Sequence, residues 1–337
     1  MHDIDGSEGG GQLLRTSLAL AVINDTGVRI TGIRGNRPEP GLKHQHLTAV
    51  NTITAACNGT VNGATLGSEE LEFEPGRPAG DHLEVDIGTA GSITLLFDTV
   101  FPLAVALSEP LVVTATGGTA VKWSPPLSTY EHAKLPLCRR LGLQAAVERH
   151  RTGFYPSGGG RATLSLAPSV VTPLELTTRG ELHGVRIYSR ESRSLADRNV
   201  ATRQAGTARA RFEAADIEVI EEVVATAETH SAGSALTVVL DYEETHAGFD
   251  ALGERGKPAE KVAQQVVERA LSFHDGDAVV DRHLADQLLV FLALAGGRLA
   301  VPELTAHVTS SLDLLSEFGL DVSVDTAADS PVLSVER

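Results

Sequence analysis

The sequence predicts an α/β (α+β) protein in which repeated α/β units form a large domain and a smaller α/β domain is inserted late in the chain. Three observations predict this fold. Apolar, strand-like runs alternate with helical stretches over residues 1–175. A loop of small residues precedes several of the helical stretches. The composition changes near residue 180, and the earlier pattern resumes near residue 278.

The first part of the chain repeats one order of elements: a helix, strands, a second helix and further strands. Apolar side chains three or four residues apart indicate helices, and β-branched runs indicate strands. The expected helices are 13–23, 41–57, a segment opened by the small residues 88–92, and 128–141. The expected strands are 28–33, short runs within 60–74 and 82–87, and 112–116. This recurrence favours a repeated unit, although the repeats share little sequence.

The later part of the chain has a different character. Segment 190–232 is polar, first rich in arginine and then strongly acidic, and it is followed by a strand at 238–240 and an amphipathic helix at 258–273. We therefore expect 180–273 to form the inserted domain, and 1–179 with 274–337 to form the main domain. Near the end, a strand at 299–305 should precede a helix capped by Ser310 or Ser311.

The composition excludes some classes of protein. The chain has 337 residues, of which 42% are hydrophobic, and this is enough for a sizeable core. No apolar run reaches about 18 residues, so no membrane span is expected. The N-terminus lacks a basic region followed by an apolar run, so no signal peptide is expected. The two cysteines lack metal-ligand spacing, which favours reduced thiols in a cytoplasmic protein.

The charge balance is strongly acidic, with a net charge of −16. Lysine is scarce and arginine supplies most of the positive charge, so we interpret the surface as one suited to high salt, as in a halophilic archaeon; an ordinary acidic enzyme is the alternative. An acidic surface alone argues against a nucleic-acid partner. In molar salt, however, the screening length falls to about 3 Å, and a small basic pocket can still bind a phosphate end.

Two clusters near the N-terminus are typical of phosphate binding. Three glycines at 9–11 stand just before a predicted helix, where backbone N–H groups and the helix dipole favour an anion. No Gly-Lys-Ser/Thr follows, so this is not a Walker A loop, and a tight structural turn is the alternative. The second cluster concentrates cationic and amide side chains that suit phosphate, although a solvated loop would look the same. Its members are Arg34, Arg37, Lys43, His44, Gln45 and His46.

Two further clusters lie near the C-terminus. His283, Asp286 and Gln287 share one face of a predicted helix for which Asp281 is a candidate N-cap, and they offer donors and acceptors for a nucleotide or a metal. His307 stands near the start of the last predicted helix. The positive partial charge there favours an uncharged imidazole, and an uncharged ring nitrogen can act as a nucleophile. Taken alone, both clusters are also compatible with structural roles.

Together these stretches resemble the RNA 3′-terminal phosphate cyclase family. The matching segments occur in the family's order from Asp5 to about Phe318. They are EGGGQLLR (8–15), PGLKHQHLTAV (40–50), GTAGSITL (88–95), GFYPSGGG (153–160) and HLADQ (283–287).

The resemblance implies a ligase that uses ATP and Mg²⁺ (or Mn²⁺) to convert an RNA 3′-phosphate end into a 2′,3′-cyclic phosphate. A histidine would attack the α-phosphate of ATP, and the resulting AMP would pass to the RNA 3′-phosphate. The neighbouring 2′-hydroxyl would then displace AMP. The expected partners are ATP and RNA, with no membrane, and a homodimer is left open.

The resemblance also assigns residues. His307 would be the nucleophile. Nucleotide contacts fall on Asp98, where the family has glutamine, and on Glu8, Gln12, His283, Leu284, Ala285, Asp286 and Gln287. Glu8 would also hold the metal or orient the nucleophile. The phosphate of the RNA end would be bound by Arg15, Arg34, Arg37, Gln45 and His46.

Two alternatives remain at this point. A non-catalytic, cyclase-like RNA-binding protein of ribosome assembly would share the fold, but it would have no need of His307 or of the HLADQ block. An enolpyruvyl transferase has a related repeated architecture, but its lysine-rich substrate clamp is missing here.

Overall fold

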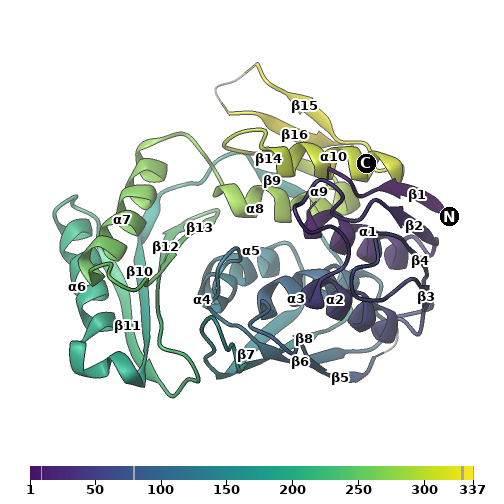
Figure 1. Cartoon of the computed structure of the whole chain (residues 1–337). Coiled ribbons are helices and arrows are strands. Elements are labelled where there is room, and N and C mark those ends of the chain that lie inside the picture. Colours follow the sequence, from purple (N-terminus) through teal and green to yellow (C-terminus); the bar gives the residue numbers. More distant parts are fainter. Residues whose placement is uncertain (9, 79, 328–329, 337) are drawn as a thin grey trace.

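The computed structural model describes residues 1–8, 10–78, 80–327 and 330–336 (Figure 1). It is a mixed α/β protein built from four-stranded sheets, in agreement with the predicted fold class. Three of these sheets belong to the main body, and the fourth belongs to the inserted segment.

The main body repeats one unit three times. The first unit comprises β1 (His2–Asp5), α1 (Gly11–Ile23), β2 (Val28–Thr31), α2 (His44–Ala56), β3 (Thr60–Asn62) and β4 (Leu71–Glu74). The second comprises β5 (His82–Asp86), α3 (Ile93–Val100), β6 (Leu111–Gly117), the helical segment α4 (Leu127–Thr129), η2 (Tyr130–Lys134) and α5 (Leu135–Arg140), then β7 (Ala145–Arg151) and β8 (Gly160–Leu166). The third comprises β9 (Leu174–Leu176), α8 (Arg282–Gln287), α9 (Leu289–Ala295), β14 (Gly297–Ala300), α10 (Ala306–Glu317), β15 (Ser323–Asp325) and β16 (Val332–Val335).

The three sheets share one topology. In each, the first two strands are parallel and joined through a helix, and the second strand pairs antiparallel with the fourth. The fourth strand pairs antiparallel with the third. The sheet orders are β1-β2-β4-β3, β5-β6-β8-β7 and β9-β14-β16-β15. The repeated unit predicted from the pattern of elements is therefore present, and it occurs three times.

The helices of the three units pack against one another inside the main body. One continuous hydrophobic cluster contains side chains of all three units, among them Leu18, Phe97 and Leu292. Burial of this apolar surface stabilises the arrangement of the units. All three units therefore present their helix ends at fixed relative positions.

The inserted segment interrupts the third unit between β9 and α8. Its sheet has the order β11-β10-β12-β13, formed by β10 (Leu182–Ser192), β11 (Val219–Ala227), β12 (Ser234–Tyr242) and β13 (His246–Leu252). Helices α6 (Val200–Glu213) and α7 (Ala259–Asp275) pack on one face, and the segment has a hydrophobic cluster of its own. These features support the proposed division into an inserted domain at 180–273 and a main domain.

The last helix begins earlier than predicted. Thr305, rather than Ser310 or Ser311, caps α10, because its hydroxyl oxygen accepts a hydrogen bond from the Val308 N–H at 3.1 Å. Strand β14 ends at Ala300, before Pro302, instead of continuing to 305. His307 consequently lies in the first turn of the helix instead of in the loop before it.

The predicted helix at 128–141 is helical but irregular. Its middle, η2, is a π-helical turn that ends just before Leu135-Pro136. Pro136 has no N–H to donate to the carbonyl four residues earlier, so the regular α-helical pattern cannot continue through this position. The wider turn includes Lys134, which lies at the site described below. Within the described part of the chain, no helix has the length and apolar character needed to cross a membrane.

Candidate active site

A cavity of about 1370 Å³ lies where the three units meet the inserted segment. Its walls come from every unit, and residues of β13 in the inserted segment also line it. Many of the residues selected from the sequence line it: Gln12, Arg15, Arg34, Arg37, Gln45, His46, Asp98, His283, Asp286, Gln287 and His307. Residues separated by almost three hundred positions are thus brought into one space.

Helix N-termini from all three units surround this cavity. The first helix of each unit begins at the cavity: α1 at Gly10–Gly11, α3 at Ser92 and α8 at Asp281. The second helix of each unit also begins there, and the lining residues are Gln45 and His46 of α2, the residues just before α4, and His307 of α10. Helix N-termini carry unpaired N–H groups and positive partial charge. The fold therefore gives an acidic protein a cavity suited to a polyanion such as a triphosphate.

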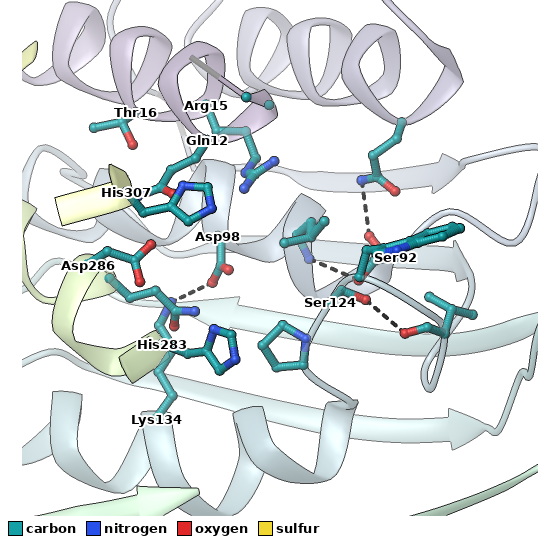
Figure 2. A pocket seen from close by; sticks show the side chains of 18 of the residues that line it. Gln12, Arg15, Thr16, Ser92, Asp98, Ser124, Lys134, His283, Asp286 and His307 are labelled. Carbon is teal, nitrogen blue, oxygen red and sulfur yellow. Dashed lines mark hydrogen bonds and ion pairs between the residues drawn. The ribbon is translucent and has the colours of Figure 1, made fainter. Parts of the chain in front are cut away.

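His307 is the second residue of α10, and its exposed side chain lies at the cavity. Figure 2 shows it facing the space that Arg15, Asp98 and Asp286 also border. The backbone around it is fixed by the Thr305 cap and by a contact with α1, in which Gln12 Nε2 donates to Ser311 Oγ at 3.0 Å. The imidazole is thus accessible while its helix is held in place.

Helix α8 presents a polar face to the cavity. Asp281 is its N-cap, as predicted: one carboxylate oxygen accepts from the N–H groups of His283 and Leu284, both at 2.9 Å. Burial raises the pKa of Asp286, whereas the nearby imidazoles of His307 and His283 oppose that rise. Leu284 and Ala285 are buried in the main core and do not line the cavity, so their side chains support the helix instead.

Asp98 forms a buried ion pair that the sequence did not reveal. The Lys134 ammonium lies 2.5 Å from the Asp98 carboxylate, and the two side chains are only 6% and 13% exposed (Figure 2). The Lys134 nitrogen also lies 5.1 Å from the centre of the Tyr130 ring. The negative charge of the Asp98 carboxylate is therefore neutralised by the protein itself.

The basic cluster on α2 and its preceding loop is only partly directed into the cavity. Arg34 donates to the carbonyls of Glu39 and Gly41, at 3.0 and 2.9 Å, and so stabilises the loop. Arg37 is exposed and makes no ion pair with the described residues. Gln45 Nε2 donates to the Ser92 carbonyl at 3.1 Å, while its buried Oε1 has no partner among the described residues.

His46 packs against the glycine turn. A Cβ atom on Gly11 would lie 2.5 Å from His46 Nε2, so only glycine leaves room for this ring. His46 Nδ1 accepts from the Lys43 N–H at 3.3 Å. Burial, together with the nearby Arg34, Arg15 and Lys43 cations, lowers the pKa of His46 to about 4. The ring is consequently neutral at pH 7 and can accept or donate a hydrogen bond without adding charge.

This depressed pKa predicts a loss of stability in acid. Because the folded protein resists protonation of His46 and the unfolded chain does not, the unfolded state binds more protons between pH 6.5 and about 4. Stability therefore falls as the pH falls through this window. We expect His46→Gln to reduce the difference in unfolding free energy between pH 7.5 and 4.5 by about 2 kcal/mol. Urea unfolding at both pH values measures this, with His44→Gln, an exposed residue of the same helix, as the control.

The described residues do not form a metal centre by themselves. No group of three or more histidine, cysteine or acidic side chains in the described part of the chain is placed to hold a metal ion. Glu8 is exposed and does not line the cavity, and Gly9 of the predicted glycine turn lies outside the described residues. Mg²⁺ commonly uses one or two carboxylates together with substrate phosphates, so a metal that arrives with a triphosphate needs no protein cluster.

The comparison with known proteins decides the family. A model of the RNA 3′-terminal phosphate cyclase family matches residues 6–324. The chain belongs to the RNA 3′-terminal phosphate cyclase family. Proteins named RNA 3′-terminal phosphate cyclase are similar over nearly their whole length. The one from Halobacterium salinarum is 43% identical over 99% of both chains. Those from Pyrococcus furiosus and Methanosarcina barkeri are each 38% identical, over 94% and 96% of this chain and 92% and 95% of their own.

Some cavity residues of this family member carried no recognisable signal in the sequence. Phe249 and Asp250 of β13 and Arg269 of α7 line the cavity although they belong to the inserted segment. Burial raises the pKa of Asp250 to about 6, and Thr129 of the main body donates to its carboxylate at 3.2 Å. These contacts depend on how the inserted sheet is placed, which local sequence patterns do not encode.

Proposed function

We propose that this protein is an ATP-dependent RNA 3′-terminal phosphate cyclase that works through a covalent histidine–AMP intermediate. The observation that carries the proposal is the accessible His307 imidazole at a cavity ringed by helix N-termini and lined by Arg15 and the α8 polar face. Membership of the family supports the overall reaction. An exposed nucleophile in such a cavity favours the enzyme over a non-catalytic RNA-binding relative.

The proposed reaction has three displacements at phosphorus. A ring nitrogen of His307 attacks the α-phosphorus of ATP, forming a P–N bond and releasing pyrophosphate. An oxygen of the RNA 3′-phosphate then attacks the same phosphorus, breaking the P–N bond and freeing the histidine. Finally the adjacent 2′-hydroxyl attacks the RNA phosphorus, loses its proton and expels AMP. Without activation, the last step would have to expel hydroxide or oxide, which is a far poorer leaving group.

The position of each residue in the cavity suggests its role in the proposed reaction. His283, Asp286 and Gln287 are proposed to bind the nucleotide beside His307, and Gln12 to position α10 through Ser311. Burial lowers the pKa of the Arg15 guanidinium, and the Asp98 and Asp286 carboxylates oppose that fall. Because the ordinary pKa of arginine is so high, the side chain stays charged and offers a cation where phosphate charge builds up. Mg²⁺ or Mn²⁺ would neutralise the triphosphate and the departing pyrophosphate.

The activity is tested by product analysis. RNA ending in a labelled 3′-phosphate, incubated with ATP and Mg²⁺, should acquire an end that resists phosphatase, with one AMP and one pyrophosphate formed per end. Omitting ATP is the control. An end that stays sensitive to phosphatase in the presence of ATP would rule out the proposed activity.

Arg37 is proposed to bind the RNA end rather than ATP. It is exposed, lines the cavity and lies beside Gly10 at the start of α1. We expect Arg37→Ala to leave self-adenylylation unchanged and to lower kcat/KM for 3′-phosphate RNA by roughly tenfold or more, because a charge-assisted contact is lost. Single-turnover assays of the two steps measure this. An equal loss in both steps would contradict the assignment.

A further inference from the structure

Two aromatic side chains stand exposed at the mouth of the cavity. The Trp123 side chain is 90% exposed and that of Tyr155 is 53% exposed, and both residues line the cavity. In the described part of the chain, these are the only phenylalanine, tyrosine or tryptophan residues classed as exposed. Aromatic residues make up just 4% of this sequence. Their coincidence at one rim is therefore informative, whereas a single exposed aromatic residue elsewhere would not be.

The fold fixes these two residues to the same rim. Trp123 follows β6, and Tyr155 follows β7, but the two loops are joined by backbone hydrogen bonds from Thr119 and Ala120 to the Gly153 carbonyl, at 2.9 and 3.2 Å. Phe154 is buried against Ala120 and anchors the second loop. The aromatic ring of Tyr155, the next residue, is left outside. Both aromatic residues therefore lie on loops that are hydrogen-bonded to each other and attached to the main body.

The backbone at Trp123 is unusual for so large a residue. Its φ angle is 64°, in the left-handed region where glycine or asparagine is preferred and where a bulky side chain is rare. Few contacts within the protein compensate for this strain, because no hydrogen bond or ring contact to the indole is found among the described residues. Such strain is characteristic of functional positions. An external ligand would explain why tryptophan occupies this position.

The surroundings indicate the chemistry of the ligand. The exposed cations Lys122 and Arg37 line the same cavity, in a chain with a large excess of acidic residues. Flat aromatic rings beside cations are what proteins use to bind single-stranded RNA, because every base has a face that can stack and each is followed by a phosphate.

We propose that Trp123 and Tyr155 form a stacking platform for the bases at the 3′ end of single-stranded RNA, which holds the terminal phosphate in the cavity. This rests on the proposed function, since that function supplies the RNA. Stacking does not depend on base identity, so the platform accepts any 3′-terminal sequence but requires an unpaired end.

The single tryptophan of this sequence provides a direct test. Without ATP, a short RNA with a 3′-phosphate should quench the fluorescence of the unmodified protein. The same RNA with its last two nucleotides lacking bases should not quench it. Equal quenching by both oligonucleotides, or by neither, would overturn the proposal. Because no ATP is present, this result does not depend on whether the protein is a cyclase.

Kinetics provide the second test. Trp123→Ala should raise KM for intact 3′-phosphate RNA on the order of tenfold, Trp123→Phe should recover most of the loss, and self-adenylylation should be unchanged in both. Removing the bases from the last two nucleotides of the RNA should raise KM far more for the unmodified protein than for Trp123→Ala. An equal rise in KM for the two proteins would show that the indole does not contact a base. Val170→Ala, which changes an apolar side chain that is 83% exposed away from the cavity, is the control. Absence of self-adenylylation in the unmodified protein would instead refute the proposed function.

Discussion

Replacing His307 with alanine is expected to abolish the covalent labelling of the protein by ATP. Incubation of the unmodified protein with α-labelled ATP and Mg²⁺ should leave an acid-labile label, as expected for a P–N bond, and the variant should retain none. The reason is chemical: the imidazole supplies the electron pair that displaces pyrophosphate, and no other group in the described structure replaces it at the first turn of α10.

The variant should remain folded, because Thr305 caps the helix and the Gln12–Ser311 contact is retained. His44→Ala, on an exposed position of α2 outside the cavity, is the matched control and should label normally. Label that persists in His307→Ala would mean that another residue is the nucleophile.

Lys134→Met is expected to cause the largest loss of stability among the substitutions considered. It leaves the Asp98 carboxylate without its counter-ion at a site where both side chains are almost fully buried. Breaking one side of a buried pair costs roughly 3–5 kcal/mol, because the remaining charge loses its partner and is poorly hydrated. Denaturant unfolding should show this as a fall in the transition midpoint.

The double variant Asp98→Asn with Lys134→Met separates the charge effect from packing. It should recover most of the lost stability, since it removes both charges and keeps side chains of similar size. Lys43→Met, which breaks the exposed pair with Glu39, should change stability little. If the double variant is as unstable as Lys134→Met, packing rather than the unpaired charge explains the loss.

The sequence predicted the repeated architecture because each unit carries its own local signals. Apolar periodicity identified the helices, and small residues marked their starts, as at Ser92, where the side chain accepts from the Leu95 N–H. The same signals did not fix the start of α10. Thr305, Ser310 and Ser311 are all acceptable caps by residue type, and only the structure shows that Thr305 accepts the Val308 N–H while the two serines lie inside the helix.

Local sequence motifs pointed to some of the residues that line the cavity. They did not point to residues whose place there depends only on the tertiary structure. His283, Asp286 and His307 were found because each stands at a helix start or on a polar helix face. Lys134 was missed because its role depends on a partner in a different helix, Asp98. Trp123 was missed because exposure cannot be deduced from a short motif.

The convergence of helix N-termini on the cavity separates the electrostatics of the interior from those of the exterior. Peptide dipoles belong to the main chain, so side-chain substitutions do not remove them. Lineages can therefore accumulate aspartate and glutamate on the outside, as an adaptation to solvent, while the attraction for polyanions inside persists. The high formal negative charge of this sequence is for that reason a poor guide to what the protein binds.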